Sequence, residues 1–196
     1  MTNKERFLEI VNTNIKRDGI DKLVNYLEKS DFFTAPASTR FHDSYSGGLL
    51  DHSLRVYDRL KELVKTYKIN TTEETIAIIS LFHDLCKVDC YSVEQRWRKD
   101  ENNQWEQYDT YKFDEKRHYG GHGSKSVFIV NFYIKLTFEE ATAINCHMGL
   151  CGDSNDYAVG DAFRTYPLAY LLHVADMMST IPYFNEKDED TTEENG

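Results

Sequence analysis

A histidine and an aspartate stand side by side at His83 and Asp84, late in an apolar stretch that runs from Thr72 to Cys90. The residues before the pair leave almost no polar face, which predicts a helix that is surrounded by protein. Burying an unpaired imidazole or carboxylate costs several kcal/mol. Because a divalent cation satisfies both groups at once, the pair is a candidate metal site, with Lys87 one turn further on.

Other ligand-type side chains also occupy positions where a helix would place hydrophobic residues. His52 falls on the stripe of Leu49 and Val56, and Asp176 lies within the apolar sequence YLLHVADMM. The full set of candidate metal ligands is His52, His83, Asp84, His122, His147 and Asp176. Each histidine alone has a second explanation, as a core residue bonded to a backbone carbonyl.

Taken together, four histidines and two aspartates exceed what one tetrahedral zinc ion needs. They suit two divalent ions bridged by a carboxylate, for which Asp84 is the candidate. Mixed imidazole and carboxylate ligation favours Mn²⁺, Fe²⁺, Co²⁺, Ni²⁺ or Zn²⁺ over calcium.

Hydrophobic periodicity predicts the helices that carry these residues. They cover residues 3–16, 20–29, 72–90, 122–135, 137–148 and 166–178, with a longer helix that begins near Gly48. The T-x-x-E sequences that begin at Thr71 and Thr137 indicate capping boxes, and Gly149 is a plausible helix C-cap. Residues 31–47 and 150–156 are expected to be irregular. The glycines around His122 should let the backbone approach a ligand closely.

Residues 90–115 differ in character, because two stretches rich in strand-forming residues flank a polar segment at residues 101–104. This pattern predicts a β-hairpin inserted into an all-α helical bundle. Its aromatic residues, with Arg96 and Arg98, form either a lid that stacks on a base or a solvated excursion packed on the domain.

Length and charge limit the number of domains and the kinds of partner. The 196 residues indicate one domain over residues 1–184, with two N-terminal helices packed on it. Residues 185–196 hold six acidic residues against one lysine, half of the net charge of −10, and are expected to be a disordered tail. No continuous basic stripe is present, which argues against tight binding of duplex nucleic acid. A small anionic, phosphate-containing substrate held by a metal is compatible with this charge.

The chain has no apolar run that approaches 18 residues and no apolar core of a signal peptide near its start. We therefore expect a cytoplasmic protein with no membrane span. The four cysteines are Cys86, Cys90, Cys146 and Cys151. Their spacings fit common zinc knuckles poorly, so they are interpreted as reduced core residues, with a structural zinc site as the alternative.

The order H…HD…H…H…D, with the local sequences GGLLDHS, LFHDLCK, GHGSKS, CHMG and LLHVAD, resembles the HD-domain superfamily of metal-dependent phosphohydrolases. The resemblance covers about residues 30–180 and is closest to the small stand-alone proteins of bacteria and their phages. It implies an HD-domain helical bundle that hydrolyses phosphate esters of nucleotides or nucleic acids. One departure is Cys86, where many relatives have glycine.

The hypothesis that follows is hydrolysis in which two metal ions polarise a phosphoryl group and activate a water molecule. Asp84 and Lys87 are the catalytic candidates, and Lys87 would neutralise a phosphate oxygen. Its alternative role is a cation favoured by the C-terminal dipole of a helix. Arg40, His42 and Arg96 are further candidates for substrate contact.

Two other functions stay open at this point. The same ligand order occurs in mixed-valent di-iron oxygenases similar to myo-inositol oxygenase, where a lysine of the HD-x-x-K sequence contacts the substrate. A non-catalytic HD module that binds a nucleotide, or a structural helical protein with buried histidines, is the third possibility.

Overall fold

The computed structural model describes residues 1–39, 42–114, 120–151 and 156–185. Within them the protein is mostly helical, with one two-stranded antiparallel sheet. The helices are α1 (Asn3–Asn14), α2 (Ile20–Lys29), α3 (Gly48–Tyr67), α4 (Glu73–Leu81), α5 (His122–Tyr133), α6 (Phe138–Cys146), α7 (Asp156–Thr165) and α8 (Pro167–Thr180), with short 3₁₀ helices η1 (Leu85–Lys87) and η3 (Gly149–Cys151). The strands are β1 (Tyr91–Lys99) and β2 (Trp105–Phe113). A largely helical fold with an inserted hairpin is therefore confirmed.

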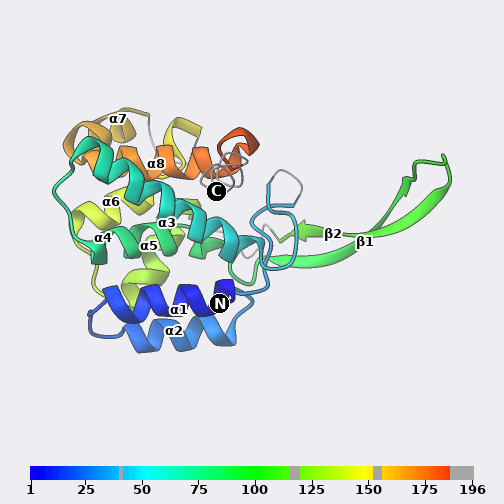
Figure 1. Cartoon of the computed structure of the whole chain (residues 1–196), viewed down its shortest axis with the longest axis horizontal. Coiled ribbons are helices and arrows are strands. Elements are labelled where there is room, and N and C mark those ends of the chain that lie inside the picture. Colours follow the sequence, from blue (N-terminus) through cyan, green and yellow to red (C-terminus); the bar gives the residue numbers. More distant parts are fainter. Residues whose placement is uncertain (40–41, 115–119, 152–155, 186–196) are drawn as a thin grey trace, which may run out of the picture.

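The helices pack as a bundle around one apolar core (Figure 1). Helix α3 packs against α4 and α8, and α6 packs against α5 and α8. The apolar faces expected for the first two helices are buried, with Phe7 and Val11 of α1 and Leu23 and Leu27 of α2 all fully covered. In the described ranges, every helix falls short of the combined length and hydropathy that a membrane span requires. The acidic tail expected over residues 185–196 lies, after Asn185, outside the described residues.

Helix α4 is shorter than the predicted helix over residues 72–90, because it ends at Leu81. Ser80 Oγ donates to the carbonyl of Ile76 at 2.6 Å, and the carbonyl of Ser80 accepts a hydrogen bond from His83 Nδ1 at 2.8 Å. These local bonds compete with the helical ladder. As a result, His83 and Asp84 lie in a turn between α4 and η1, not on a helix.

Threonine caps begin both helices for which a capping box was predicted. At α6 the box is present, because Thr137 Oγ1 accepts from the Glu140 amide at 3.2 Å and Glu140 Oε2 accepts from the Thr137 amide at 2.8 Å. At α4 the prediction was one residue early, since Thr72 rather than Thr71 is the N-cap. Glu74 accepts instead from the backbone amide of Lys16, at 2.7 Å.

The carboxylate of Glu140 also ties the N-terminal helices to the bundle. Arg17, between α1 and α2, donates from Nη1 and Nη2 to the two oxygens of Glu140, each at 2.7 Å. Thr75 of α4 donates to Glu140 Oε1 at 3.0 Å. Burial opposes ionisation of Glu140, but the Arg17 guanidinium and the Thr137 amide hold its pKa below the usual value. One fully buried carboxylate thus links three parts of the chain.

We expect Glu140→Gln to lower the free energy of unfolding by about 3 kcal/mol at pH 7, because Arg17 loses its fully buried counter-charge and keeps only the longer ion pair with the partly exposed Glu74. The melting temperature should fall by roughly 6–12 °C. Since the folded pKa of Glu140 is lowered, its stabilising contribution is present above the unfolded pKa near 4.5 and is lost as the pH falls through the folded pKa. Thermal unfolding at several pH values should therefore show the two proteins converging in acid. The neighbouring Glu139→Gln is the matched control, and equal losses in both variants would contradict this role for Glu140.

The hairpin pairs Tyr91 with Phe113 at its base and Lys99 with Trp105 near its tip. The polar segment forms the turn, where Asp100 Oδ1 accepts from the Gln104 amide at 2.7 Å. Figure 1 shows the ribbon extending away from the helical body instead of lying against it.

Candidate metal centre

Five of the six predicted ligands converge at one buried point where α3, α6, α8 and the turn after α4 meet. His52 Nε2 lies 3.0 Å from Asp176 Oδ1 and 3.3 Å from His83 Nε2. Asp84 Oδ2 lies 3.4 Å from His83 Nε2, and Asp84 Oδ1 lies 3.4 Å from His147 Nε2. The three histidines have no exposed surface, while Asp84 is 3 % and Asp176 is 9 % exposed.

Backbone carbonyls fix the protonation of two of these rings. His83 Nδ1 lies 2.8 Å from the carbonyl of Ser80, and His147 Nδ1 lies 2.6 Å from the carbonyl of Ile144. Because a carbonyl only accepts hydrogen bonds, Nδ1 must be the donor in both rings. In a neutral imidazole Nε2 is then an acceptor, and in both rings it points toward the carboxylates.

The centre therefore brings acceptors face to face. The lone pair of His147 Nε2 faces a carboxylate oxygen of Asp84, and this buried nitrogen has no hydrogen-bond partner among the described residues. His83 Nε2 also faces Asp84, at 3.4 Å, and lies 3.3 Å from His52 Nε2. Such contacts between two acceptors are unfavourable unless a cation lies between the groups. Metal-binding histidines also usually donate a hydrogen bond from the other ring nitrogen to a carbonyl or carboxylate, as Nδ1 does here. The buried histidines and aspartates could thus hold a metal ion.

The carboxylates of the centre are ionised. Burial opposes the charge of Asp84, yet the Lys87 ammonium, 2.7 Å away, holds its pKa well below the usual value. Burial likewise opposes the charge of Asp176, but its hydrogen bond with His52 lowers its pKa. The pKa of Lys87 is raised, because attraction to Asp84 outweighs the effect of burial. Two carboxylates and one ammonium leave net negative charge for a cation to neutralise.

His122, the sixth predicted ligand, lies near Asp84 in a separate group of possible ligands. Its Nδ1 is 3.4 Å from the sulfur of Cys86, which is 4.0 Å from Asp84 Oδ1. One ligand atom from each of Asp84, Cys86 and His122 fits within 4.8 Å of the others. Asp84 therefore belongs to two groups of possible ligands, which suits a bridging role.

Cys86 is a possible ligand that the sequence predicted to be a reduced core residue, with a structural zinc site as the alternative. It is buried as expected, and burial raises the pKa of its thiol to about 12. Its position two residues after Asp84 was the available signal, but no spacing rule marked it as a ligand.

Gly123, one of the glycines expected to let the backbone approach a ligand near His122, brings two helices together. A Cβ atom at Gly123 would lie 2.1 Å from the carbonyl oxygen of Asn145 in α6. The side chain of Ser124 donates to Asn145 Oδ1 at 3.0 Å across the same contact. The missing side chain thus sets the separation between the helices that carry His122 and His147.

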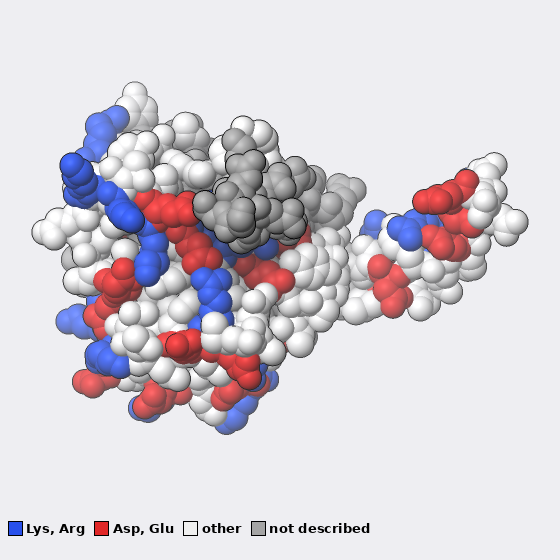
Figure 2. Space-filling model, in the orientation of Figure 1, with Lys and Arg blue, Asp and Glu red and all other residues white. Residues whose placement is uncertain are grey.

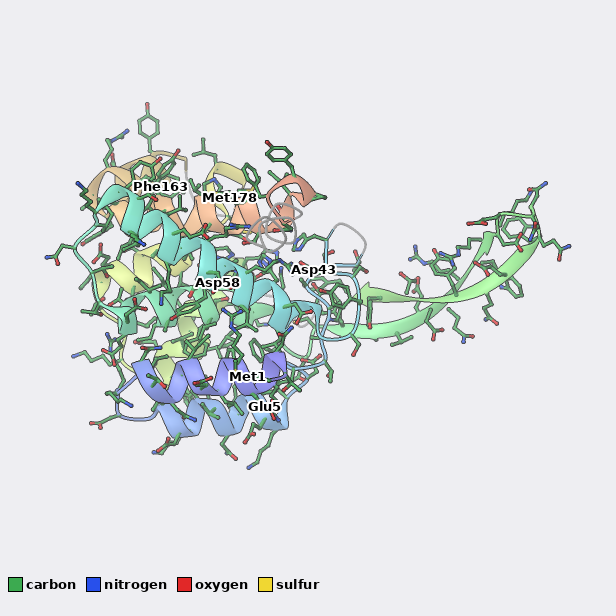
Figure 3. The ribbon with its side chains drawn as sticks, in the orientation of Figure 1. Met1, Glu5, Asp43, Asp58, Phe163 and Met178 are labelled. Atoms are coloured by element: carbon green, nitrogen blue, oxygen red, sulfur yellow. The ribbon has the colours of Figure 1, made fainter. Side chains whose placement is uncertain are left out.

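Asp43 supports the centre from outside and was not among the predicted site residues. It lies beyond the N-terminal end of α3, close to where the hairpin leaves the body (Figure 3). Its Oδ2 atom pairs with Arg55, lies 3.2 Å from His42 Nδ1 and lies 4.0 Å from His52 Nδ1. Burial opposes ionisation of Asp43, but His42 and Arg55 lower its pKa. Asp43 therefore places a negative charge behind the ring of His52.

A cavity of about 680 Å³ opens beside the centre. Among the described residues, its walls include His42, Asp84, Lys87, His122, His147, Met148, Leu150, Gly160, Phe163, Tyr170, His173, Asp176, Met177 and Thr180. The four predicted substrate contacts have different fates. His42 and Lys87 line the cavity, Arg96 lies on the projecting strand β1 beside Glu94, and Arg40 lies outside the described residues.

Helices α7 and α8 supply a wall that sequence reasoning did not assign. The ring of Phe163 stacks on His173 with 5.7 Å between centroids, and His173 Nδ1 donates to the carbonyl of His147 at 2.7 Å (Figure 3 labels Phe163). His173 thereby connects the aromatic wall to the segment that carries a predicted ligand.

Comparisons of the chain with models of protein families, with curated proteins and with solved structures gave no match.

Proposed function

We propose that this protein is a metal-dependent phosphohydrolase of the HD-domain type, acting on a phosphate ester of a nucleotide or of a nucleic-acid end. The observation that carries the proposal is the convergence of His52, His83, Asp84, His147 and Asp176, in which lone pairs of buried imidazoles face carboxylates at 3.4 Å. The order of these residues, which resembles the ligand order of that superfamily, supports the same conclusion.

The donor set fits one or two divalent transition metal ions, with Mn²⁺, Fe²⁺, Co²⁺, Ni²⁺ and Zn²⁺ as the candidates. His52, His83, His147 and Asp176 would hold metal together with Asp84, and His122 would hold it in a second group of ligands that shares Asp84. When bound, such ions supply a lowered pKa of water and a polarised phosphoryl group. Ser80 and Ile144 keep the rings of His83 and His147 oriented through their carbonyls.

Lys87 contributes the positive charge that the substrate phosphate requires. Its ammonium lines the cavity, and its side chain is only 12 % exposed. Salt bridging to Asp84 keeps it protonated and fixes its position. The apolar wall of Met148, Leu150 and Phe163 can hold the organic part of the ester. A cavity of about 680 Å³ accommodates a ligand the size of a nucleotide.

The test is hydrolysis of a panel of nucleoside monophosphates, cyclic dinucleotides and a chromogenic phosphate diester by metal-free protein reloaded with one metal at a time. We expect turnover with at least one of the five metals and none after chelation. Absence of phosphate-ester turnover with every metal, in protein that demonstrably binds metal, would overturn the proposal.

An anaerobic arm separates hydrolysis from oxygenation. A phosphohydrolase keeps its rate without O₂, whereas a mixed-valent di-iron oxygenase would be coloured, iron-loaded and oxygen-consuming. Oxygen uptake coupled to loss of a polyol, with no phosphate released, would favour the oxygenase.

A further inference from the structure

The hairpin presents an open strand edge to solvent. Its strands pack chiefly on each other among the described elements, and the ribbon stands clear of the helical body with charges of both signs along it (Figure 2). Val93 and Trp97 are 63 % and 62 % exposed. A two-stranded ribbon is marginally stable alone, and an uncovered edge is a template for another strand.

Backbone bonds at the two ends of the ribbon show which groups face outward. The Asp100 amide donates to the Gln104 carbonyl and the Asp114 amide donates to the Cys90 carbonyl, each at 2.8 Å. Hydrogen-bonded and non-bonded pairs alternate in an antiparallel ladder, so the even-numbered residues of β1 bond to β2. The backbone N–H and C=O groups that point to the free edge belong to Tyr91, Val93, Gln95, Trp97 and Lys99.

We propose that this free edge of β1 binds the same edge of a second copy of the chain, antiparallel, with Gln95 of both copies on the twofold axis. In that register Glu94 of one copy lies opposite Arg96 of the other, and Val93 lies opposite Trp97. Twofold symmetry makes each pair occur twice. Pairs of opposite charge, and pairs of an aromatic with a β-branched residue, are the ones that stabilise neighbouring strands. The strand is thus complementary to itself, and a second copy is the partner it fits.

The charges select this register over its neighbours. Moving the twofold axis to residue 94 places Glu94 opposite itself, and moving it to residue 96 places Arg96 opposite itself. Both shifts create like charges at directly facing positions, which is destabilising. The free edge of β2 is also disfavoured, because the equivalent central axis would place Asp109 opposite Asp109. The four-stranded sheet therefore has the order β2, β1, β1 and β2.

Charge exchange tests the proposal directly. Glu94→Arg and Arg96→Glu each place like charges opposite each other in the homodimer, and each should raise the dimer Kd about tenfold or more. Mixing the two variants restores opposite charges at both positions, so the mixture should associate about as tightly as the wild type. Sedimentation velocity measures the Kd of the wild type, of each variant and of the mixture. Lys112→Glu on β2 makes the same charge change as Arg96→Glu outside the interface and should leave the Kd unchanged.

Three results would overturn the proposal. One is a wild type that stays monomeric up to about 100 μM, where even a micromolar Kd gives mostly dimer. The second is a pair of variants that associate as tightly as the wild type, and the third is a mixture that does not recover. Far-ultraviolet circular dichroism checks that the variants are folded, since the substitutions lie on the projecting ribbon and should leave the helical signal intact.

Discussion

Replacing Asp84 by asparagine is expected to lower phosphate-ester hydrolysis by roughly three orders of magnitude or more. The carboxylate faces His83 and His147 through its two oxygens and belongs to both groups of possible ligands. An amide has the same shape but no negative charge, so it cannot neutralise a bridging cation. Metal ions stabilise a transition state by several kcal/mol, and each ~1.4 kcal/mol corresponds to a factor of ten in rate.

Metal content gives a second readout of Asp84→Asn that does not depend on the substrate. The variant should retain less metal after dialysis, and added Mn²⁺ or Zn²⁺ should raise its melting temperature less than that of the wild type. Asp21→Asn, an exposed position on α2, is the matched control and should behave as the wild type. An Asp84→Asn protein that keeps both wild-type metal content and wild-type turnover would show that this carboxylate holds no metal.

Many residues of the metal centre could be predicted from the sequence, because a histidine or aspartate on an apolar helical stripe needs a buried partner for its polar atoms. His52 and Asp176 were found in this way, and both side chains are buried at the centre. Periodicity reports which face of a helix is buried. It does not report where a helix ends, which is why the prediction carried α4 past Leu81 to include His83. The end is set by hydrogen bonds around Ser80, with no glycine or proline to mark it.

Other features depend on contacts between segments that are distant in sequence. Asp43 matters because the loop before α3 brings it to the back of His52, and no local pattern indicates that. Helix α7 was not assigned, although Val159 and Phe163 have helical spacing and Pro167 marks the start of the next helix. The hairpin was predicted, but its projection from the body depends on packing that strand propensity does not describe.

Gly123→Ala is expected to be among the most destabilising single substitutions in the chain. The added methyl group would lie 2.1 Å from the Asn145 carbonyl oxygen and 2.6 Å from its Cα, so α5 and α6 must separate. Overpacking of this kind typically lowers the free energy of unfolding by roughly 1–3 kcal/mol. Because the clash here is with backbone, we expect a loss of about 3 kcal/mol. The melting temperature should fall by roughly 6–12 °C. Metal affinity should fall as well, because α5 begins with His122 and α6 leads into His147.

Gly160→Ala provides the matched control, with an expected change of the opposite sign. It lies inside α7, where the nearest atom to an added methyl group is the flexible end of Arg164 at 3.6 Å. Alanine there removes the entropic penalty of a helical glycine, which is worth about 0.5–1 kcal/mol, and the melting temperature should rise. If Gly123→Ala were as stable as Gly160→Ala and bound metal normally, the α5–α6 contact would not set the separation of His122 and His147. A stability loss confined to Gly123→Ala, together with weaker metal binding, ties the packing of these two helices to the centre.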